Sequence, residues 1–304
     1  MSAARHFLVV SHTGRAAALE ATVEVCQRLL AEGAVPVIAA EHWDDVQEVV
    51  PELDGRALRL EAVDPAVIEL VIVLGGDGTI LRAAELIRPH PAPLLGVNLG
   101  HVGFLAESER DDLGLTITRA LARDYAVEER MTLSVRAKVG AEVVYESWAL
   151  NEVTVEKAER ERMLEVVIEV DRRPLSSFGC DGVVMSTPTG STAYAFSAGG
   201  PVVWPSLEAL LLVPLSAHAL FARPLVVGPE SSLAVEILQR TETSAVIWCD
   251  GRRTFDLPAG SRVIVRRSAV PVRLARLHEA PFTDRLVNKF QLPVTGWRGP
   301  SGRD

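Results

Sequence analysis

The chain has 304 residues, of which 48% are hydrophobic and 23% are charged, and its net charge is −9. This length allows two domains or one large one, and the hydrophobic content supports a sizeable core. The acidic balance argues against nucleic acid as a partner, since phosphate backbones require basic surfaces, and the lack of an apolar stretch of ~18 residues argues against a membrane.

The first part of the chain alternates short apolar runs with helical patterns. In residues 16–32, for example, Leu19, Val23, Cys26 and Leu30 recur at the spacing of one helix face. Strands are expected at residues 7–10, 35–39, 67–74 and 94–97, and helices at 16–32, 80–87 and 111–123. This alternation predicts a parallel sheet wrapped by helices.

The pattern changes after Tyr125, where strand-like and largely alternating runs follow one another. They lie at residues 131–139, 142–150, 153–156, 164–170, 233–238, 244–249 and 262–267. We therefore predict an α/β domain over residues 1–125 and a β-rich, sandwich-like domain over 126–275. The tail at 276–304 contains a helical pattern from Phe282 to Gln291 and is expected to pack back on the first domain.

The N-terminus and the cysteines indicate the compartment. Residues 1–10 contain only a short apolar run, which is typical of a first strand and not of a signal peptide. Cys26, Cys180 and Cys249 are odd in number and widely spaced, which favours neither a disulfide framework nor a zinc site. The sequence therefore predicts reduced thiols in a cytoplasmic protein.

The most informative motif is the run Gly-Gly-Asp-Gly-Thr at residues 75–79, between the expected strand 67–74 and helix 80–87. Glycines around an acid let a phosphorylated ligand approach the backbone closely. Thr79 is expected to cap the helix, whose N-terminal dipole would then face the bound anion. The alternative is a tight turn with an exposed Asp77, but the placement after a buried strand favours a nucleotide or phosphate site.

A second unusual segment is residues 182–207, which contain no Asp, Glu, Lys or Arg. One interpretation is a buried, turn-rich core whose hydroxyls bond their own backbone. The other is the lining of a pocket, because hydroxyls and amides can bind a neutral heterocycle between small side chains. Asp181 lies at the edge of this segment.

Two common nucleotide-binding motifs are missing. The three lysines, Lys138, Lys157 and Lys289, lie outside any Gly-x-x-x-x-Gly-Lys-Ser/Thr loop, which excludes a P-loop NTPase. The sequence also lacks Gly-x-Gly-x-x-Gly, the usual fingerprint of dehydrogenases.

Taken together, the motifs resemble the NAD kinase family over roughly residues 5 to 297. The matching segments are Gly75–Thr79, Asn98–Leu105, Asn151-Glu152, Cys180–Val203, Pro214–Leu225 and Asp250-Gly251. Lipid kinases share Gly-Gly-Asp-Gly, so this turn alone is moderately specific, whereas the ordered set is highly specific.

The resemblance implies an enzyme that transfers a phosphoryl group from ATP, or also from polyphosphate, to the adenosine ribose 2′-hydroxyl of NAD. It implies a divalent cation, Mg²⁺, which we expect the donor phosphates to bridge, because no dedicated carboxylate cage is visible. It also implies a homodimer or homotetramer.

The roles of individual residues follow from the resemblance. Asp77 is the expected catalytic carboxylate, which orients or deprotonates the attacking hydroxyl. The turn expected to contact phosphate consists of Gly75, Gly76, Gly78 and Thr79. The expected NAD-binding residues are Asp77, Gly78, Arg82, Asn151, Glu152, Arg162, Asp181, Thr192, Ala193, Tyr194 and Ser197.

Several of these residues have structural alternatives. Arg82 could pair with Glu85 on the exposed face of its helix instead of reaching the pyrophosphate. Arg162 ends a charged stretch of a kind that is usually solvated, and Tyr194 could belong to the core. Asp181 could cap neighbouring amides, and Asp250 is a further candidate for a ligand contact or for an acid beside the metal.

Two other functions remain open at this point. A lipid kinase would need an apolar acyl channel, which the small, hydroxyl-rich segment disfavours. A non-catalytic NAD sensor would not need Asp77, so the intact turn argues against it.

Overall fold

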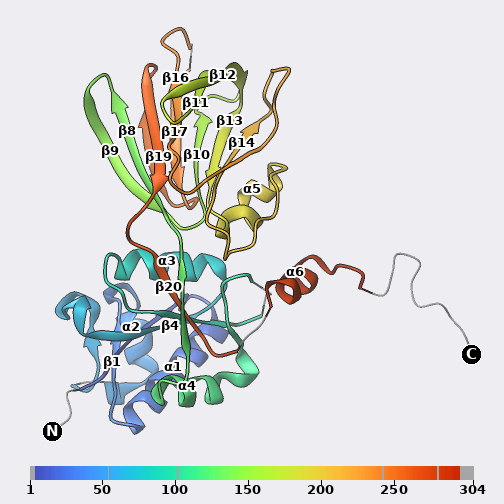
Figure 1. Ribbon diagram of the computed structural model, residues 1–304. Coiled ribbons are helices and arrows are strands. Elements are labelled where there is room, and N and C mark those ends of the chain that lie inside the picture. Colours follow the sequence, from blue (N-terminus) through green and yellow to red (C-terminus); the bar gives the residue numbers. More distant parts are fainter. Residues whose placement is uncertain (1–3, 54, 101–102, 242, 279–280, 295–304) are drawn as a thin grey trace, which may run out of the picture. The chain divides into compact units, whose positions relative to one another are not determined.

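The computed structural model describes residues 4–53, 55–100, 103–241, 243–278 and 281–294 (Figure 1). The chain forms two compact units, which are described separately below. Unit 1 comprises residues 1–129 and 272–304, and unit 2 comprises residues 130–271.

Unit 1 is built on an eight-stranded sheet with the order β3-β2-β1-β4-β5-β20-β7, and β6 pairs with β5. The strands are β1 (His6–Ser11), β2 (Val35–Ile38), β3 (Leu58–Arg59), β4 (Ile68–Leu74), β5 (Leu94–Asn98), β6 (Ser108–Glu109), β7 (Ala126–Arg130) and β20 (Val272–Arg276). The pairs from β3 to β20 along this order are parallel, as the alternation of strands and helices predicts.

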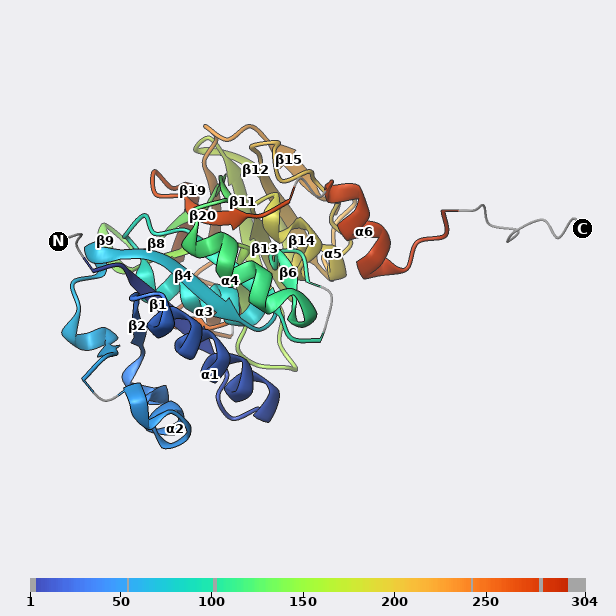
Figure 2. The ribbon, with the colours of Figure 1, turned by 90° about the horizontal axis from the view of Figure 1, so that it is seen from below.

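Unit 1 also contains α-helices. They are α1 (Ala16–Ala31), α2 (Ala40–Val49), α3 (Asp77–Ile87), α4 (Leu113–Leu121) and α6 (Phe282–Phe290). Figures 1 and 2 show α1 and α4 on one face of the sheet and α3 on the other. Residues of β4 such as Leu70 and Ile72 are fully buried and pack with Phe7 and Leu29, which explains the nearly continuous apolar run of this strand.

Unit 2 contains two six-stranded sheets, β15-β14-β13-β10-β17-β18 and β12-β11-β16-β19-β8-β9. The strands are β8 (Leu133–Val139), β9 (Glu142–Ala149), β10 (Glu152–Lys157), β11 (Leu164–Val170), β12 (Arg173–Cys180), β13 (Gly182–Ser186), β14 (Leu210–Leu215), β15 (Leu225–Val227), β16 (Leu233–Ile237), β17 (Ala245–Cys249), β18 (Arg253–Leu257) and β19 (Ser261–Arg267). A short helix, α5 (Tyr194–Ser197), lies in the connection between β13 and β14.

The core of unit 2 joins both of its sheets. Val153 and Met185 come from the first sheet, Val166 and Val263 come from the second, and all are fully buried in one cluster. The inward side chains alternate with exposed ones along β8, as expected for a strand with one solvated face. The predicted sandwich-like, β-rich architecture is therefore confirmed.

Candidate active site

Three turns of unit 1 follow β1, β4 and β5, and they lie at the end of the sheet where the carboxyl ends of these strands meet. Ser11 pairs with Leu74, and Leu74 with Val97, in parallel register, so the carboxyl ends of these strands are level. The strand order runs outward in opposite directions from β1 and β4. In open parallel sheets, ligands bind at such a switch point.

The glycine turn after β4 leads directly into α3. Gly76 is the N-cap residue and Asp77 is the first helical residue. The expectation that Thr79 caps the helix is wrong, because the helix starts two residues before Thr79. Instead, a Cβ atom at Gly75 would collide with the Thr79 side chain, so Thr79 fixes the tight entry of the chain into α3.

Space around the other two glycines of the turn is open. A Cβ atom added at Gly76 or Gly78 would meet no other atom within 4 Å. The first amides of α3 have no partner within the helix and carry the positive end of its dipole. The turn therefore offers backbone donors and free space where a phosphate could approach.

The carboxylate of Asp77 is held by two backbone N–H groups from the segment after β5. The N–H of Phe104 donates to Oδ2 and that of Leu105 donates to Oδ1, each at 3.1 Å. A Cβ atom at Gly103 would lie 2.5 Å from Oδ1, so the segment can approach this closely only with glycine there. These bonds use one lone pair of each oxygen and fix the orientation of the carboxylate.

The segment from Asn98 to Leu105 lies at the same edge of the sheet. The side-chain oxygen of Asn98 accepts the N–H of Gly100 at 3.3 Å. His101 and Val102, which belong to the same motif, lie outside the described residues. The motif thus supplies both a strand-end turn and the amides that hold Asp77.

Arg82 pairs with a residue of another helix. Its guanidinium forms an ion pair with Glu41 of α2, because the fold brings the start of α2 beside α3. The adjacent His42 contacts Glu41 at 3.3 Å and Thr13 at 2.9 Å. Arg82 is therefore tied to the turn after β1 through α2.

In unit 2, Asn151 and Glu152 lie at the start of β10. The carbonyl oxygen of Asn151 accepts the N–H of Thr187 at 2.9 Å and the hydroxyl of Ser186 at 3.0 Å. A Cβ atom at Gly190 would collide with the same carbonyl group. The uncharged segment after β13 therefore packs directly against the Asn-Glu pair.

Glu152 is a buried carboxyl group with an incomplete set of partners. Its residue is 7% exposed, and Oε2 has no hydrogen-bond partner among the described residues. Burial raises the pKa of this carboxyl to about 8, the charge of Asp250 adds to the increase, and the backbone N–H of Tyr194 opposes it. At neutral pH this group is therefore mostly protonated and can both donate and accept a hydrogen bond.

Asp250 uses its carboxylate to hold the backbone before Glu152. Its oxygens accept the N–H of Leu150 at 2.9 Å, that of Asn151 at 2.7 Å, and Nη2 of Arg253 at 3.0 Å. Burial raises the pKa of Asp250, whereas these donors oppose the increase. This bonding gives Asp250 a role in shaping the Asn-Glu pair.

The uncharged segment of residues 182–207 is buried in its first part and more exposed in its second part. Residues 182–191 are buried, so this part belongs to the core. In contrast, Tyr194 is 39% exposed, which contradicts a place for it in the core, and Ser197 is also exposed. Thr192 and Ala193 are half-buried between these two parts.

The remaining predicted residues lie on the surface of unit 2. Asp181 forms an ion pair with Lys157 at 2.5 Å, and this partner lowers the pKa of its carboxyl. Arg162 is exposed in the connection before β11. Both positions are open to solvent and accessible to a ligand.

The residues that the structure describes contain no group of three or more His, Cys, Asp or Glu side chains that could hold a metal ion. The three cysteines are buried free thiols. Within the described chain, no helix is both long and apolar enough to cross a membrane.

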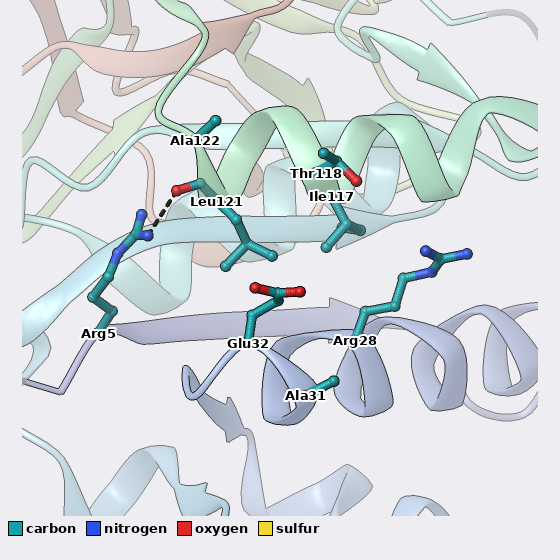
Figure 3. A pocket seen from close by; sticks show the side chains of 8 residues that line it. All are labelled: Arg5, Arg28, Ala31, Glu32, Ile117, Thr118, Leu121 and Ala122. Atoms are coloured by element: carbon teal, nitrogen blue, oxygen red, sulfur yellow. Dashed lines mark hydrogen bonds between the residues drawn. The ribbon is translucent and has the colours of Figure 1, made fainter.

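A pocket of about 480 Å³ lies elsewhere in unit 1, between the C-terminal halves of α1 and α4 (Figure 3). Arg5, which precedes β1, reaches its rim and donates to the carbonyl oxygen of Leu121 at 2.7 Å. None of the predicted site residues lines this pocket, which lies at the opposite edge of the sheet from the glycine turn.

Two family models match the chain in succession. Residues 7–125 match the ATP-NAD kinase N-terminal domain, and residues 150–277 match the ATP-NAD kinase C-terminal domain. The first match includes Asp77 and the amides that hold it, and the second includes Asn151 and Glu152.

Curated relatives match over the full length. The NAD kinase of Leifsonia xyli subsp. xyli is 71% identical over 304 residues, which cover 100% of both chains. The NAD kinase of Mycobacterium tuberculosis is 52% identical over 308 residues, which cover 98% of this chain and 100% of the relative.

Solved structures share the fold. Yeast NADH kinase, crystallised in complex with NADH, has a TM-score of 0.84 at 22% identity, covering 99% of this chain and 89% of the yeast chain. An NAD kinase from Archaeoglobus fulgidus in complex with ATP has a TM-score of 0.70 at 24% identity, covering 94% and 98%. The fold deduced above is thus the fold of these kinases.

Proposed function

The chain belongs to the NAD kinase family and converts NAD to NADP with ATP as the phosphoryl donor, and we propose that the carboxylate of Asp77 carries the central step. The acceptor is the 2′-hydroxyl of the adenosine ribose, which is a poor nucleophile at neutral pH. A carboxylate that orients this hydroxyl and accepts its proton lowers the barrier to attack.

The observation that supports this role is the way in which Asp77 is held. Two backbone N–H groups fix both carboxylate oxygens and leave a lone pair on each for the substrate hydroxyl. A base that is oriented before the substrate arrives loses little entropy on reaching the reactive geometry.

The glycine turn is proposed to hold the phosphates of the donor. Gly75, Gly76, Gly78 and Thr79 lie at the positive end of α3, where backbone amides can stabilise charge on the transferring group. The open space at Gly76 and Gly78 lets the phosphate oxygens approach the backbone.

Mg²⁺ is assigned to the donor and not to a protein cage. No cluster of three potential ligand side chains exists among the described residues, which does not suit a dedicated site. We infer that the ion enters as MgATP, bridged by the donor phosphates, and we assign no catalytic step of this chain to it.

We assign NAD binding mainly to unit 2. The unpartnered Oε2 of the neutral Glu152 carboxyl suits a sugar hydroxyl, and Asn151 offers an amide beside it. Asp181, Tyr194 and Ser197 offer exposed polar groups and one ring for the rest of the dinucleotide. The further proposed NAD contacts are Gly78, Arg82, Arg162, Thr192 and Ala193.

Among the alternatives, a lipid kinase is disfavoured because residues 150–277 match the C-terminal domain of ATP-NAD kinases. We further propose a cytoplasmic homodimer or homotetramer that accepts polyphosphate as well as ATP. Light scattering of the purified protein would measure the subunit count.

The test is an assay of the purified protein with NAD, Mg²⁺ and a panel of donors. We expect NADP from ATP, and a slower reaction from polyphosphate. If NAD bound but no donor gave NADP, the protein would be a sensor and the proposed role of Asp77 would fail.

A further inference from the structure

The segment of residues 103–107 contacts Asp77 with its amides and the C-terminal helix α6 with its carbonyl groups. The amides are the N–H groups of Phe104 and Leu105, which hold the two oxygens of Asp77. Because α6 lies far from Asp77 in sequence, this segment links the proposed base to the C-terminal part of the chain.

Arg285 of α6 makes the polar contacts on the other side of this segment. Its Nη1 donates to the carbonyl oxygens of Phe104 at 2.9 Å and Ala106 at 2.8 Å, and its Nη2 donates to Oε2 of Glu107 at 2.9 Å. The side chain of Arg285 is 13% exposed, so these bonds are shielded from water. One guanidinium thus binds three residues of the segment.

Arg285 and Asp77 bind opposite ends of the same peptide group. The carbonyl of Phe104 and the N–H of Leu105 belong to one planar unit, so fixing the oxygen also fixes the direction of the N–H. A positive charge on the oxygen polarises this unit and strengthens the N–H as a donor to the carboxylate.

The guanidinium is itself anchored independently of Asp77. Its partner Glu107 has a side chain that is 1% exposed and also accepts the N–H groups of Leu277 and His278 at 3.0 and 2.9 Å. Arg276 also reaches Glu107, but it donates to the carbonyl of Leu105, which belongs to the following peptide group.

Packing holds the same segment through a separate contact. The ring of Phe104 lies 5.9 Å from that of Phe282 and 5.8 Å from that of Phe290, both on α6. These rings anchor the side chain of Phe104, whereas Arg285 determines the orientation of its carbonyl. The two contributions can therefore be separated by mutation.

We propose that Arg285 is a positioning residue for phosphoryl transfer, which aligns the Asp77 carboxylate through the peptide group between Phe104 and Leu105. This inference rests on the proposed function of Asp77. It assigns α6 to the catalytic machinery although no residue of α6 belongs to the glycine turn.

The test compares Arg285→Met with Arg110→Met in the full-length protein. Arg110 is an exposed arginine of unit 1 that pairs with Glu20, so its loss controls for the change of charge. We expect Arg285→Met to lower kcat ~10-fold, since small misplacements of a reacting group cost one to two orders of magnitude. The KM for NAD should stay within twofold, and Arg110→Met should match the unmodified chain.

A double-mutant cycle with Asp77→Asn separates positioning from general stabilisation. If Arg285 acts through Asp77, Arg285→Met should cause no further loss of kcat in the Asp77→Asn background. Arg285→Lys keeps the charge and can still donate hydrogen bonds, so it should restore part of kcat and serves as the test if Arg285→Met does not fold.

The outcomes distinguish this inference from the proposed function. If Asp77→Asn abolishes turnover but both Arg285 variants keep normal kcat, the inference fails and the function of Asp77 stands. If Arg285→Met lowers kcat equally with and without Asp77, its effect is structural and the positioning role fails. If Asp77→Asn itself keeps turnover, the proposed base is wrong and the inference fails with it.

Discussion

Asp77 in unit 1 and Glu152 in unit 2 are carboxyl groups at strand ends, and they differ in how their oxygens are satisfied. Asp77 receives a backbone N–H on each oxygen from Phe104 and Leu105. Glu152 is more deeply buried, and its Oε2 has no hydrogen-bond partner among the described residues.

The difference suits the separate roles that we propose for these two groups in one reaction. A carboxylate held by fixed amides is suited to act on a proton in a defined direction. A buried neutral carboxyl group with an unpaired oxygen has a cost in free energy, and a ligand that forms the missing hydrogen bond removes this cost. Such a group is therefore suited to ligand recognition. We therefore expect changes at Asp77 to affect turnover and changes at Glu152 to affect affinity.

The largest expected effect comes from Asp77→Asn. The amide keeps the size of the side chain but cannot accept the proton of the 2′-hydroxyl, so turnover should fall by at least ~10²-fold. The Kd for NAD, measured by calorimetry, should stay within a few-fold. Near-normal turnover in this variant would remove the distinction between the two carboxyl groups.

The pH dependence of stability should identify Glu152 as the neutral member of the pair. Its pKa is raised from 4.5 to about 8 in the folded protein, so the folded state keeps a proton that the unfolded chain releases. The contribution of Glu152 to the free energy of unfolding is fully present below pH 4.5. As the pH rises from 4.5 towards 8, the free energy of unfolding falls by at most about 1.4 kcal/mol per pH unit. Urea denaturation at pH 6, 7 and 8 should show this slope, and Glu152→Gln should remove it.

Glu69 provides the matched control for that measurement. Hydrogen bonds from Arg123 and Arg5 lower the pKa of Glu69 to about 2. The stability that it contributes is present above pH 4.5 and is lost only as the pH falls towards 2. Glu69→Gln should therefore change the free energy of unfolding by the same amount at pH 6, 7 and 8. If the decrease in stability with pH persisted in Glu152→Gln, a group other than Glu152 would cause it.

Glu152→Ala should weaken NAD binding about 10-fold, which corresponds to the loss of one hydrogen bond to a buried group. At saturating NAD, kcat should fall less than threefold, because the carboxylate of Asp77 remains in place. Calorimetry and steady-state kinetics together would check this division. A large loss of kcat with unchanged Kd would assign Glu152 to the chemical step instead.

Local sequence features predicted much of unit 1. The nearly continuous apolar run of β4 and the glycines after it placed Asp77 at the carboxyl edge of a parallel sheet. However, the amides that hold Asp77 come from Phe104 and Leu105, which are 27 and 28 residues further along the chain. A local sequence pattern cannot predict these two hydrogen bonds, because they depend on the register of neighbouring strands.

The features that the sequence did not show have the same physical origin. Glu85 was one possible partner for Arg82 because of its helical spacing, but tertiary packing brings Glu41 to the guanidinium. The burial of Glu152 was also hidden, since a carboxyl group at a strand end is usually solvated. The role of Asp250 in holding two amides could be recognised only from the folded backbone.

The smallest expected effect concerns the space beside Asp77. Gly78 lies in the first turn of α3 with no atom within 4 Å of an added Cβ, so Gly78→Ala should fold normally and gain up to ~1 kcal/mol of helix stability. If donor phosphates approach this backbone, the added methyl group should raise the KM for ATP about threefold and change kcat little.

Gly103→Ala is the matched comparison, because its Cβ would lie 2.5 Å from Oδ1 of Asp77 and displace the carboxylate. It should therefore lower kcat and leave the KM for ATP nearly unchanged. The two added methyl groups would then separate the space for the donor from the orientation of the base. An unchanged KM for ATP in Gly78→Ala would mean that the donor phosphates bind away from the glycine turn. Asp77 would then be the one residue of this turn that takes part in the reaction.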